Sequence, residues 1–223
     1  MNLHFITSIS RDYWYITGKK CISTWDLPGK VTIFVEQRSG DLSWTNELPF
    51  PWQLVYAPDL ELGRLTAKTK VSKFWGKSCA QMYAVRERDT DERVIWLDAD
   101  IEQTNPVPPE VFNYLFDEPL AMLNSGDNED CWESGVVIFN QRFEKLNLIM
   151  NKYEHAWTNE EILSSLWKPY DAQVLGYVAT QRGYKNLCHT PCSNVNALKN
   201  SYLAEYFIHW INKENKAKLN EQD

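Results

Sequence analysis

The sequence predicts an α/β fold with a mostly parallel central sheet flanked by helices. Short apolar runs rich in β-branched residues alternate with longer segments of helical periodicity, as in βαβ units. The run Val94–Leu97 is apolar without interruption, which is typical of a strand buried on both faces of a parallel sheet. No repeat or low-complexity linker divides the 223 residues, so we expect a single domain over residues 1–223.

The first part of the chain is expected to fold in the order strand, helix, strand. The two strands are Leu3–Ile6 and Val31–Val35, and Ser10 can cap a helix between them that ends at Gly18. This order is typical of a nucleotide-binding, Rossmann-like half. Residues 40–63 are rich in proline and tryptophan and are expected to form a long irregular loop.

The remaining elements follow from helical and strand periodicity. Helices are expected at residues 72–88, 106–116, 143–157, 158–167 and 171–182, and further strands at 120–123, 135–139 and near Leu187. Thr158 and Glu161 have the spacing of a capping box at the start of one of these helices. The charged tail, residues 212–223, is expected to fray.

Composition and charge exclude several classes of partner. The formal net charge is −7, so a nucleic acid is not an expected partner, and any bound phosphate should meet a few placed cations and a metal. We find neither a signal-peptide pattern nor an apolar stretch long enough to span a membrane. Five scattered cysteines are consistent with free thiols in a reducing compartment, so we expect a cytoplasmic protein.

The segment Asp98-Ala99-Asp100 directly follows the predicted central strand. Open α/β sheets bind their ligands at the carboxyl ends of the strands. Two carboxylates placed there repel each other unless a cation or a proton compensates, and a hard divalent metal is the natural compensator. The alternative interpretation is that these residues only form a polar turn.

Four motifs occur in a fixed order along the chain. They are WLDAD, ending at Asp100, ESGVVIFN from Glu133, DAQ from Asp171 and HWINKENK from His209. In order and spacing they resemble the GT-A-fold glycosyltransferases with a DXD metal site, particularly the retaining families related to family 8. The resemblance spans residues 5–216. It implies a GT-A domain that transfers a hexose from a UDP-sugar to a glycan or other acceptor hydroxyl, with Mn²⁺ and with retention of configuration.

The resemblance also implies roles for individual residues. Asp98, Asp100 and His209 would hold Mn²⁺, with Mg²⁺ as the second choice, and Asp98 would also lie near the ribose. The ion would neutralise the charge that develops on the leaving diphosphate. The other positions implied to bind the UDP-sugar are Thr7, Ser8, Tyr13, Lys73, Lys77, Ala99 and either Lys213 or Lys216. Those implied to surround the donor sugar as catalytic residues are Asp171, Gln173 and Glu133.

Three features depart from the family pattern. Glu133 stands where family 8 usually has asparagine, although a strand that starts with ESG also resembles that of some mannosyltransferases. The segment from Asp171 to Gln173 reads DAQ where DQD is common. The usual glycine after His209 is absent, which leaves the phosphate-facing lysine open between two candidates.

Each candidate residue also has a purely structural interpretation. His209 can be a core histidine, and Asp171 can be a helix N-cap. Lys73 and Lys77 can lie on a solvated helix face. Thr7, Ser8 and Tyr13 can contact the nucleoside, or they can be core and cap residues. Three tryptophans can stack on an acceptor sugar or anchor loops: Trp44, Trp52 and Trp132.

Three alternative functions remain. A haloacid-dehalogenase-like phosphatase also has Asp-x-Asp after a buried strand, but Glu102 stands where that family has threonine or valine. A sugar nucleotidyltransferase would carry a glycine-rich loop after Ile6, which is missing. A non-catalytic sugar-nucleotide or glycan-binding module has no need for both aspartates and His209. Metal-dependent release of UDP from UDP-sugars separates the module from the enzyme.

Overall fold

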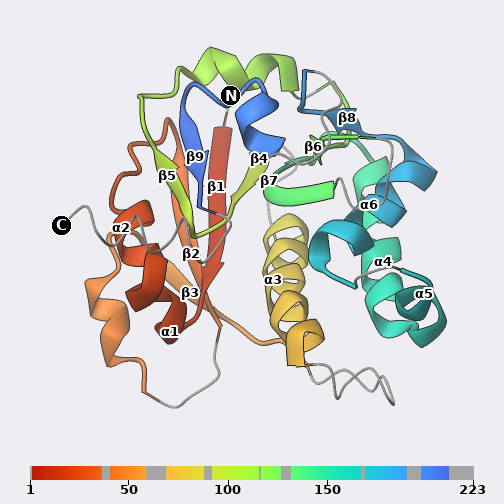
Figure 1. Cartoon of the computed structure of the whole chain (residues 1–223), viewed down its shortest axis with the longest axis horizontal. Coiled ribbons are helices and arrows are strands. Elements are labelled where there is room, and N and C mark those ends of the chain that lie inside the picture. Colours follow the sequence, from red (N-terminus) through yellow and green to blue (C-terminus); the bar gives the residue numbers. More distant parts are fainter. Residues whose placement is uncertain are drawn as a thin grey trace.

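The computed structural model describes residues 2–36, 41–58, 69–87, 92–115, 117–126, 132–166, 169–189 and 197–210. It confirms the predicted fold class, because a seven-stranded, mostly parallel sheet is flanked by helices (Figure 1). The strand order is β3-β2-β1-β4-β7-β6-β8. The strands are β1 (Asn2–Ile9), β2 (Lys30–Glu36), β3 (Trp52–Val55), β4 (Glu92–Leu97), β6 (Leu120–Asn124), β7 (Trp132–Asn140) and β8 (Lys185–Asn186).

The direction of the strands determines where polar side chains gather. Strands β1, β2, β3 and β4 run parallel, so their carboxyl ends meet at one edge of the sheet. Strand β7 is antiparallel to β4, with Leu97 opposite Val136. The first residues of β7 therefore lie at the same edge as the carboxyl end of β4.

Helices and helical turns cover both faces of the sheet. The longest are α3 (Thr69–Arg86), α4 (Lys145–Thr158) and α6 (Asp171–Arg182), and α5 (Glu160–Ser165) follows α4. The others are α1 (Arg11–Tyr13), the π-helical turn η1 (Trp14–Gly18), α2 (Lys19–Ile22), and the 3₁₀ turns η2 (Ser43–Glu47), η3 (Pro109–Leu115) and η5 (Ala197–Asn200). None of the described helices combines the length and apolarity that a membrane span requires.

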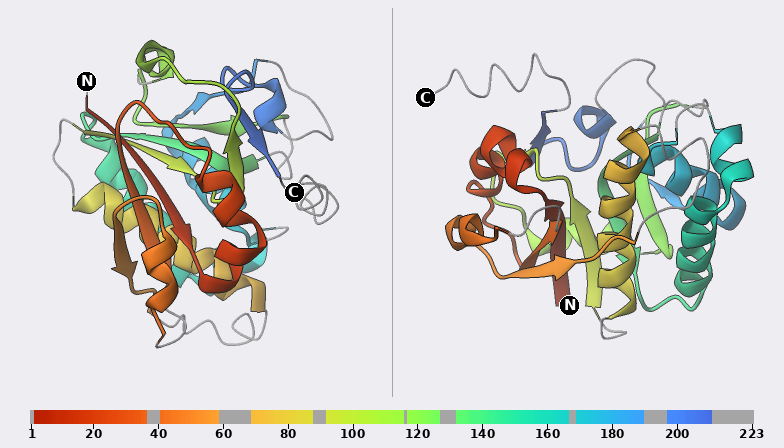
Figure 2. Two further views of the ribbon diagram at one scale, coloured as in Figure 1. Left: turned by 90° about the vertical axis from the view of Figure 1, so that its left-hand side faces the viewer. Right: turned by 90° about the horizontal axis from the view of Figure 1, so that it is seen from below.

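Helical segments lie on both sides of the sheet (Figure 2), and a hydrophobic core lies on each of its faces. Neighbouring residues of a strand point to opposite faces. Ile6 and Trp96 accordingly belong to the core that contains residues of α3, α4 and α6. Phe5 and Ile95 belong to the other core, with residues of α2 and the 3₁₀ turns.

A second, two-stranded sheet brings distant parts of the chain together. Strands β5 (Ile101–Gln103) and β9 (Phe207–His209) are antiparallel, with Ile101 opposite His209 (Figure 1). In the sequence, residues 206–210 form only a short apolar stretch, because three-residue strands show no clear alternation. This pairing returns the C-terminal part of the described chain to the end of β4.

Two predictions in the first part of the chain are wrong. Helical structure continues beyond Gly18 as far as Ile22, and the side chain of Ser10 makes no capping hydrogen bond. Gly18 instead allows close packing, because a Cβ atom at this position would overlap the side chain of Ile9. Residues 40–63 are not wholly irregular, since β3 pairs with β2 and buries Val55.

Other boundaries also differ from the prediction. The side chain of Asn159, not of Thr158, caps α5, accepting from the backbone N–H of Ile162 at 3.0 Å. Thr158 ends α4, and its hydroxyl donates to the carbonyl of Glu154 at 3.2 Å. Between residues 106 and 116 the structure has a 3₁₀ turn that begins only at Pro109. Strand β7 begins at Trp132, and residues 212–223 lie outside the described residues.

Candidate active site

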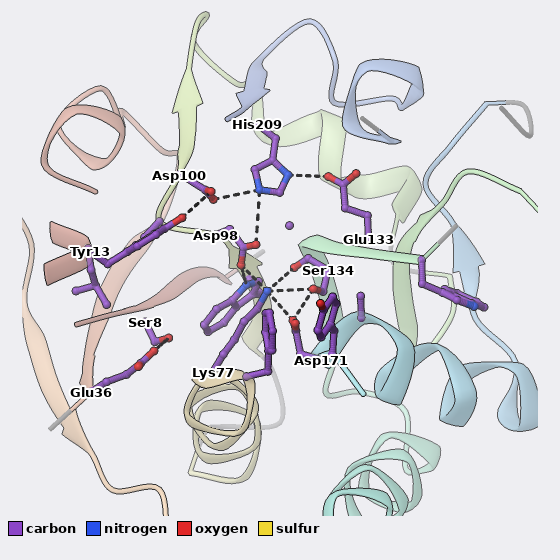
Figure 3. Close-up of a pocket in the computed structure, with 18 of the residues that line it drawn as sticks. Ser8, Tyr13, Glu36, Lys77, Asp98, Asp100, Glu133, Ser134, Asp171 and His209 are labelled. Atoms are coloured by element: carbon purple, nitrogen blue, oxygen red, sulfur yellow. Dashed lines mark hydrogen bonds and ion pairs between the residues drawn. The ribbon is translucent and has the colours of Figure 1, made fainter. Parts of the chain in front are cut away.

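A pocket of about 440 Å³ opens where the carboxyl ends of β1, β2 and β4 meet the beginnings of β7 and α6 (Figure 3). Its lining includes Ser8, Tyr13, Lys77, Ala99 and Gln173, all of which the sequence analysis assigned to a site. Parallel strands end at the same edge of a sheet, and α/β sheets bind ligands at that edge. The ligand-binding residues are therefore expected to gather there.

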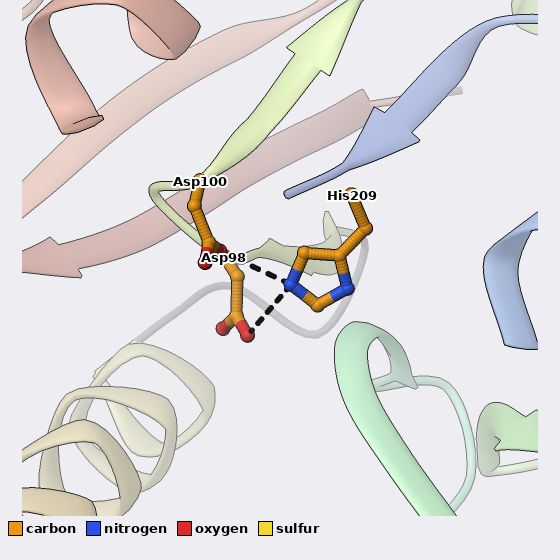
Figure 4. Close-up of side chains that lie close together, drawn as sticks. All are labelled: Asp98, Asp100 and His209. Atoms are coloured by element: carbon orange, nitrogen blue, oxygen red, sulfur yellow. Dashed lines mark hydrogen bonds and ion pairs between the residues drawn. The ribbon is translucent and has the colours of Figure 1, made fainter. Parts of the chain in front are cut away.

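Asp98, Asp100 and His209 converge in this pocket. One ligand atom from each side chain lies within 4.8 Å of the others (Figure 4). The Nε2 atom of His209 is 3.1 Å from Oδ1 of Asp100 and 3.6 Å from Oδ2 of Asp98. Two carboxylate oxygens and one imidazole nitrogen are a suitable donor set for Mn²⁺, and also for Mg²⁺.

Backbone hydrogen bonds hold the two aspartates in place. The N–H of Asp98 donates to the carbonyl of Gly135 at 2.8 Å, which ties the end of β4 to β7. The N–H of Ile101 donates to the carbonyl of Asp98 at 2.9 Å and closes a tight turn. The N–H of Trp210 donates to the carbonyl of Asp100 at 3.1 Å, so the turn is also tied to the residue after β9.

His209 is buried among charged groups, with a relative exposure of 7%. Its Nδ1 atom lies 2.7 Å from Oε1 of Glu133. Burial alone would lower the pKa of His209, but the charge of Asp100 and hydrogen bonds with Asp100 and Glu133 raise that pKa to about 10. In the metal-free protein the carboxylates of Asp100 and Glu133 therefore favour the protonated imidazole, and its surroundings differ from those of an ordinary apolar core histidine.

Lys77 on α3 lies at the centre of a buried ion-pair network. Its Nζ atom is 2.6 Å from Oδ1 of Asp98 and 2.7 Å from Oδ2 of Asp171. It also donates to the hydroxyl of Ser134 at 3.0 Å. Burial would lower the pKa of Lys77, but the charges of Asp171 and Asp98 hold it above its usual value. The interpretation of Lys77 as part of a solvated helix face is therefore wrong.

Strand alternation explains why Asp98 meets Lys77. Trp96 packs on the α3 face of the sheet, and Asp98 follows it two residues later. The indole N–H of Trp96 donates to Oδ1 of Asp98 at 2.7 Å. Burial raises the pKa of Asp98, and Lys77 opposes that effect.

Asp171 is the first residue of α6, and the N-cap position belongs to Tyr170. The carboxylate of Asp171 is buried and accepts a short hydrogen bond from the hydroxyl of Ser134 in addition to its ion pair with Lys77. The N-cap interpretation of Asp171 is therefore wrong. Gln173 lies one residue beyond Ala172 and lines the same pocket.

The residues expected near the nucleoside occupy two different environments. Ser8 lines the pocket and donates to Oε1 of Glu36 at 2.8 Å. The Tyr13 hydroxyl donates to Oδ2 of Asp100 at 2.7 Å, and burial, together with the charge of Asp100, raises the pKa of Tyr13. Thr7 does not line this pocket and is fully buried.

Several predicted positions are not placed in the pocket. Lys73 belongs to α3, but its side chain lies outside the described part of the chain, as do Lys213 and Lys216. Trp44 is part of a hydrophobic core, and Trp52 lies on the edge strand β3 with 38% exposure.

The sequence analysis also missed residues of the pocket. Glu36 is the last residue of β2, and an acid at the carboxyl end of the second strand was the available signal. Ser134 lies inside the ESG motif but was given no role. Phe74 and Tyr170 form an aromatic pair with ring centroids 4.7 Å apart, and both line the pocket. No sequence pattern connects these two residues, because Phe74 lies on α3 and Tyr170 directly precedes α6.

No protein-family model and no curated protein matches the sequence. Among solved structures, the galactosyltransferase LgtC in complex with donor and acceptor sugar analogues has a TM-score of 0.56 and 10% identity, covering 98% of this chain and 95% of that chain. GlyE of Streptococcus pneumoniae TIGR4, a glycosyltransferase, has a TM-score of 0.51 and 14% identity, over 83% of this chain and 46% of that one. The bifunctional glycosyltransferase WbbM has a TM-score of 0.55 and 12% identity, over 100% of this chain and 52% of that one.

These matches identify the class of fold as that of the GT-A glycosyltransferases. The chain matches LgtC over nearly the full length of both chains. It spans about half the length of GlyE and of WbbM. At these low identities the likeness concerns the fold alone.

Proposed function

We propose that this protein is a metal-dependent glycosyltransferase that moves a hexose from a UDP-sugar to a hydroxyl of a glycan or another acceptor. One observation carries this proposal. Asp98, Asp100 and His209 converge at the ligand-binding edge of the sheet, in a chain that has the GT-A fold. A non-catalytic module of the same fold has no need for two aspartates and a histidine that converge in this way.

Asp98, Asp100 and His209 would hold Mn²⁺, which when bound supplies Lewis-acid stabilisation for the charge on a leaving diphosphate. On the β1 and β2 side of the pocket, Ser8 and Glu36 offer a hydroxyl and a carboxylate to the ribose hydroxyls. The other side is where the donor sugar and the acceptor would lie. Lys77 keeps a positive charge among the carboxylates and so limits the repulsion between them and a diphosphate.

Asp171 and Gln173 are the groups we place beside the donor sugar. Lys77 and Ser134 orient the carboxylate of Asp171 from the side of α3 and β7. Its charge is also favoured by the amino end of α6. An anion held in this way can stabilise positive charge that develops at an anomeric carbon. A solved LgtC variant is described as a Gln-to-Glu mutant of the active site of that protein.

UDP binding is expected to require a divalent ion. Because the pocket is rich in carboxylates, the diphosphate should bind about tenfold or more weakly when EDTA replaces Mn²⁺. Isothermal titration of UDP under both conditions measures this difference. Asp100→Asn should abolish the metal dependence, whereas Asp117→Asn, which removes only the exposed partner of Lys185, should preserve it. Equal affinities with and without Mn²⁺ would contradict the proposed site.

Turnover separates an enzyme from a binding module of the same fold. UDP-glucose and UDP-galactose, incubated with Mn²⁺ and with or without glycan acceptors, should yield free UDP. Metal-dependent UDP binding without any UDP release would support the non-catalytic alternative.

The transfer is expected to retain the configuration of the anomeric carbon. This expectation is supported only by the order of the four motifs. Slow hydrolysis of an α-linked UDP-sugar should give the α-anomer as the first-formed product, which time-resolved proton NMR detects before the anomers equilibrate. A first-formed β-anomer would contradict the comparison with family 8 and make Asp171 or Glu133 a general base.

A further inference from the structure

We propose that Glu133 is a positioning residue for His209, holding the imidazole so that Nε2 faces the metal ion. This inference rests on the metal site of the proposed function. The sequence analysis placed Glu133 beside the donor sugar, but its contacts are with the C-terminal segment that carries His209.

Both oxygens of the Glu133 carboxylate have partners in that segment. Oε1 lies 2.7 Å from Nδ1 of His209 (Figure 3). Oε2 accepts a hydrogen bond from the backbone N–H of Ala197, at the beginning of η5, at 2.8 Å. One side chain of β7 therefore holds both η5 and β9 against the main sheet. Its own exposure is 16%, so most of it is removed from solvent.

The two nitrogens of the His209 ring have different surroundings. Nδ1 faces Glu133, whereas Nε2 faces Asp100 at 3.1 Å and Asp98 at 3.6 Å. A carboxylate can only accept a hydrogen bond, so Nδ1 must carry the proton in this contact. Nε2 of the neutral ring is then the atom with a free lone pair, and it faces the other two ligands. A carboxylate partner of this kind also makes the imidazole a better electron donor to a metal.

The position of His209 explains why such support is needed. Strand β9 has only three residues, and its partner β5 is equally short. Few backbone hydrogen bonds therefore define the direction of the ring. Glu133, in contrast, stands on the nine-residue strand β7 in the main sheet. The hydrogen bond from the ring to this carboxylate therefore fixes the orientation of His209 relative to the main sheet.

The metal affinity of Glu133 variants tests this inference. Free Mn²⁺ is measured by electron paramagnetic resonance during titration of the full chain. Glu133→Ala should weaken Mn²⁺ binding by about 10- to 100-fold. Glu133→Gln should weaken it less, because the amide oxygen can still accept from Nδ1. Glu102→Gln is the matched control, since Glu102 accepts from the indole N–H of Trp210 at 2.8 Å in the same region, and it should bind Mn²⁺ like the wild type.

A second measurement shows which nitrogen of the His209 ring carries the proton. The chain has only four histidines, so long-range ¹H–¹⁵N spectra of the Mg²⁺-loaded protein can resolve His209. We expect a single form, with the proton on Nδ1 and Nε2 bound to Mg²⁺, in the wild type and in Glu133→Gln. In Glu133→Ala we expect a second form as well, from molecules in which the ring has left the ion. A purely structural role would change the melting temperature and leave this pattern unchanged.

Three results would overturn the inference. They are unchanged Mn²⁺ affinity in Glu133→Ala, an equal loss in Glu102→Gln, or the same ring spectrum in all variants. Wild-type protein that does not bind Mn²⁺ would overturn the inference together with the metal site. Wild-type protein that binds Mn²⁺ with the expected dependence on Glu133, but releases no UDP from any donor, would overturn the proposed enzyme and leave this inference standing.

Discussion

Lys77→Met is expected to lower the free energy of unfolding by about 3–5 kcal/mol and to abolish UDP release. Methionine keeps most of the length and apolar volume of the lysine side chain, so the packing around it is largely preserved. What is lost is the ammonium group that lies 2.6 Å from Asp98 and 2.7 Å from Asp171.

The expected loss is large because the charges left behind are buried. The side chains of Lys77 and Asp171 are 12% and 4% exposed. Without the ammonium group, Asp171 keeps the hydrogen bond from the neutral hydroxyl of Ser134, and the two carboxylates of the network repel each other. Breaking a buried ion pair by removing one partner is costly for this reason, even where the intact pair adds little net stability.

Urea unfolding of the metal-free proteins measures the change. The matched control is Lys19→Met, which makes the same substitution in an ion pair with Glu47 at 2.9 Å on the surface. Both side chains of that pair are well exposed to solvent, so the control should unfold almost like the wild type. Equal stability of Lys77→Met and wild type would show that the carboxylates do not depend on Lys77.

Gly135→Ala is expected to weaken Mn²⁺ binding by about tenfold or more and to lower the free energy of unfolding by about 1–3 kcal/mol. A Cβ atom on Gly135 would lie 2.5 Å from Cε1 and 2.6 Å from Nδ1 of the His209 ring. It would also lie 3.3 Å from Oε1 of Glu133. The ring is held at both nitrogens, so it cannot move aside without losing its contacts with Glu133 or Asp100.

A double-mutant cycle tests whether the clash with the His209 ring causes the destabilisation by Gly135→Ala. In a His209→Ala background the added methyl group has space, so Gly135→Ala should be neutral or stabilising, since alanine is favoured over glycine inside a strand by about 0.5–1 kcal/mol. Melting curves of the four proteins give the free-energy differences, and Mn²⁺ titration of the two proteins with His209 gives the effect on the site. The same destabilisation in both backgrounds would mean that the conflict is with the strand and not with the ring.

The sequence determined the local features of this protein. The apolar run of β4 and the helical periodicity of α3, α4 and α6 were sufficient to predict the α/β class. A strand or helix that is buried on one or two faces carries apolar residues at a regular spacing along the sequence. The position of Asp98 and Asp100 after β4 predicted where a ligand site would lie. The order of the motifs added His209 to that site, and the structure brings its side chain together with both aspartates.

Only the tertiary structure decided which groups face one another in the site. Periodicity predicts the apolar face of α3, but it does not say that Lys77 lies against Asp98 and Asp171. Likewise, nothing in the ESG motif indicates that Glu133 contacts a histidine 76 residues further along the chain. Such contacts depend on strand directions, on the pairing of the short strands β5 and β9, and on the packing of the whole chain. Each local pattern is compatible with several such arrangements, and only the folded chain selects among them.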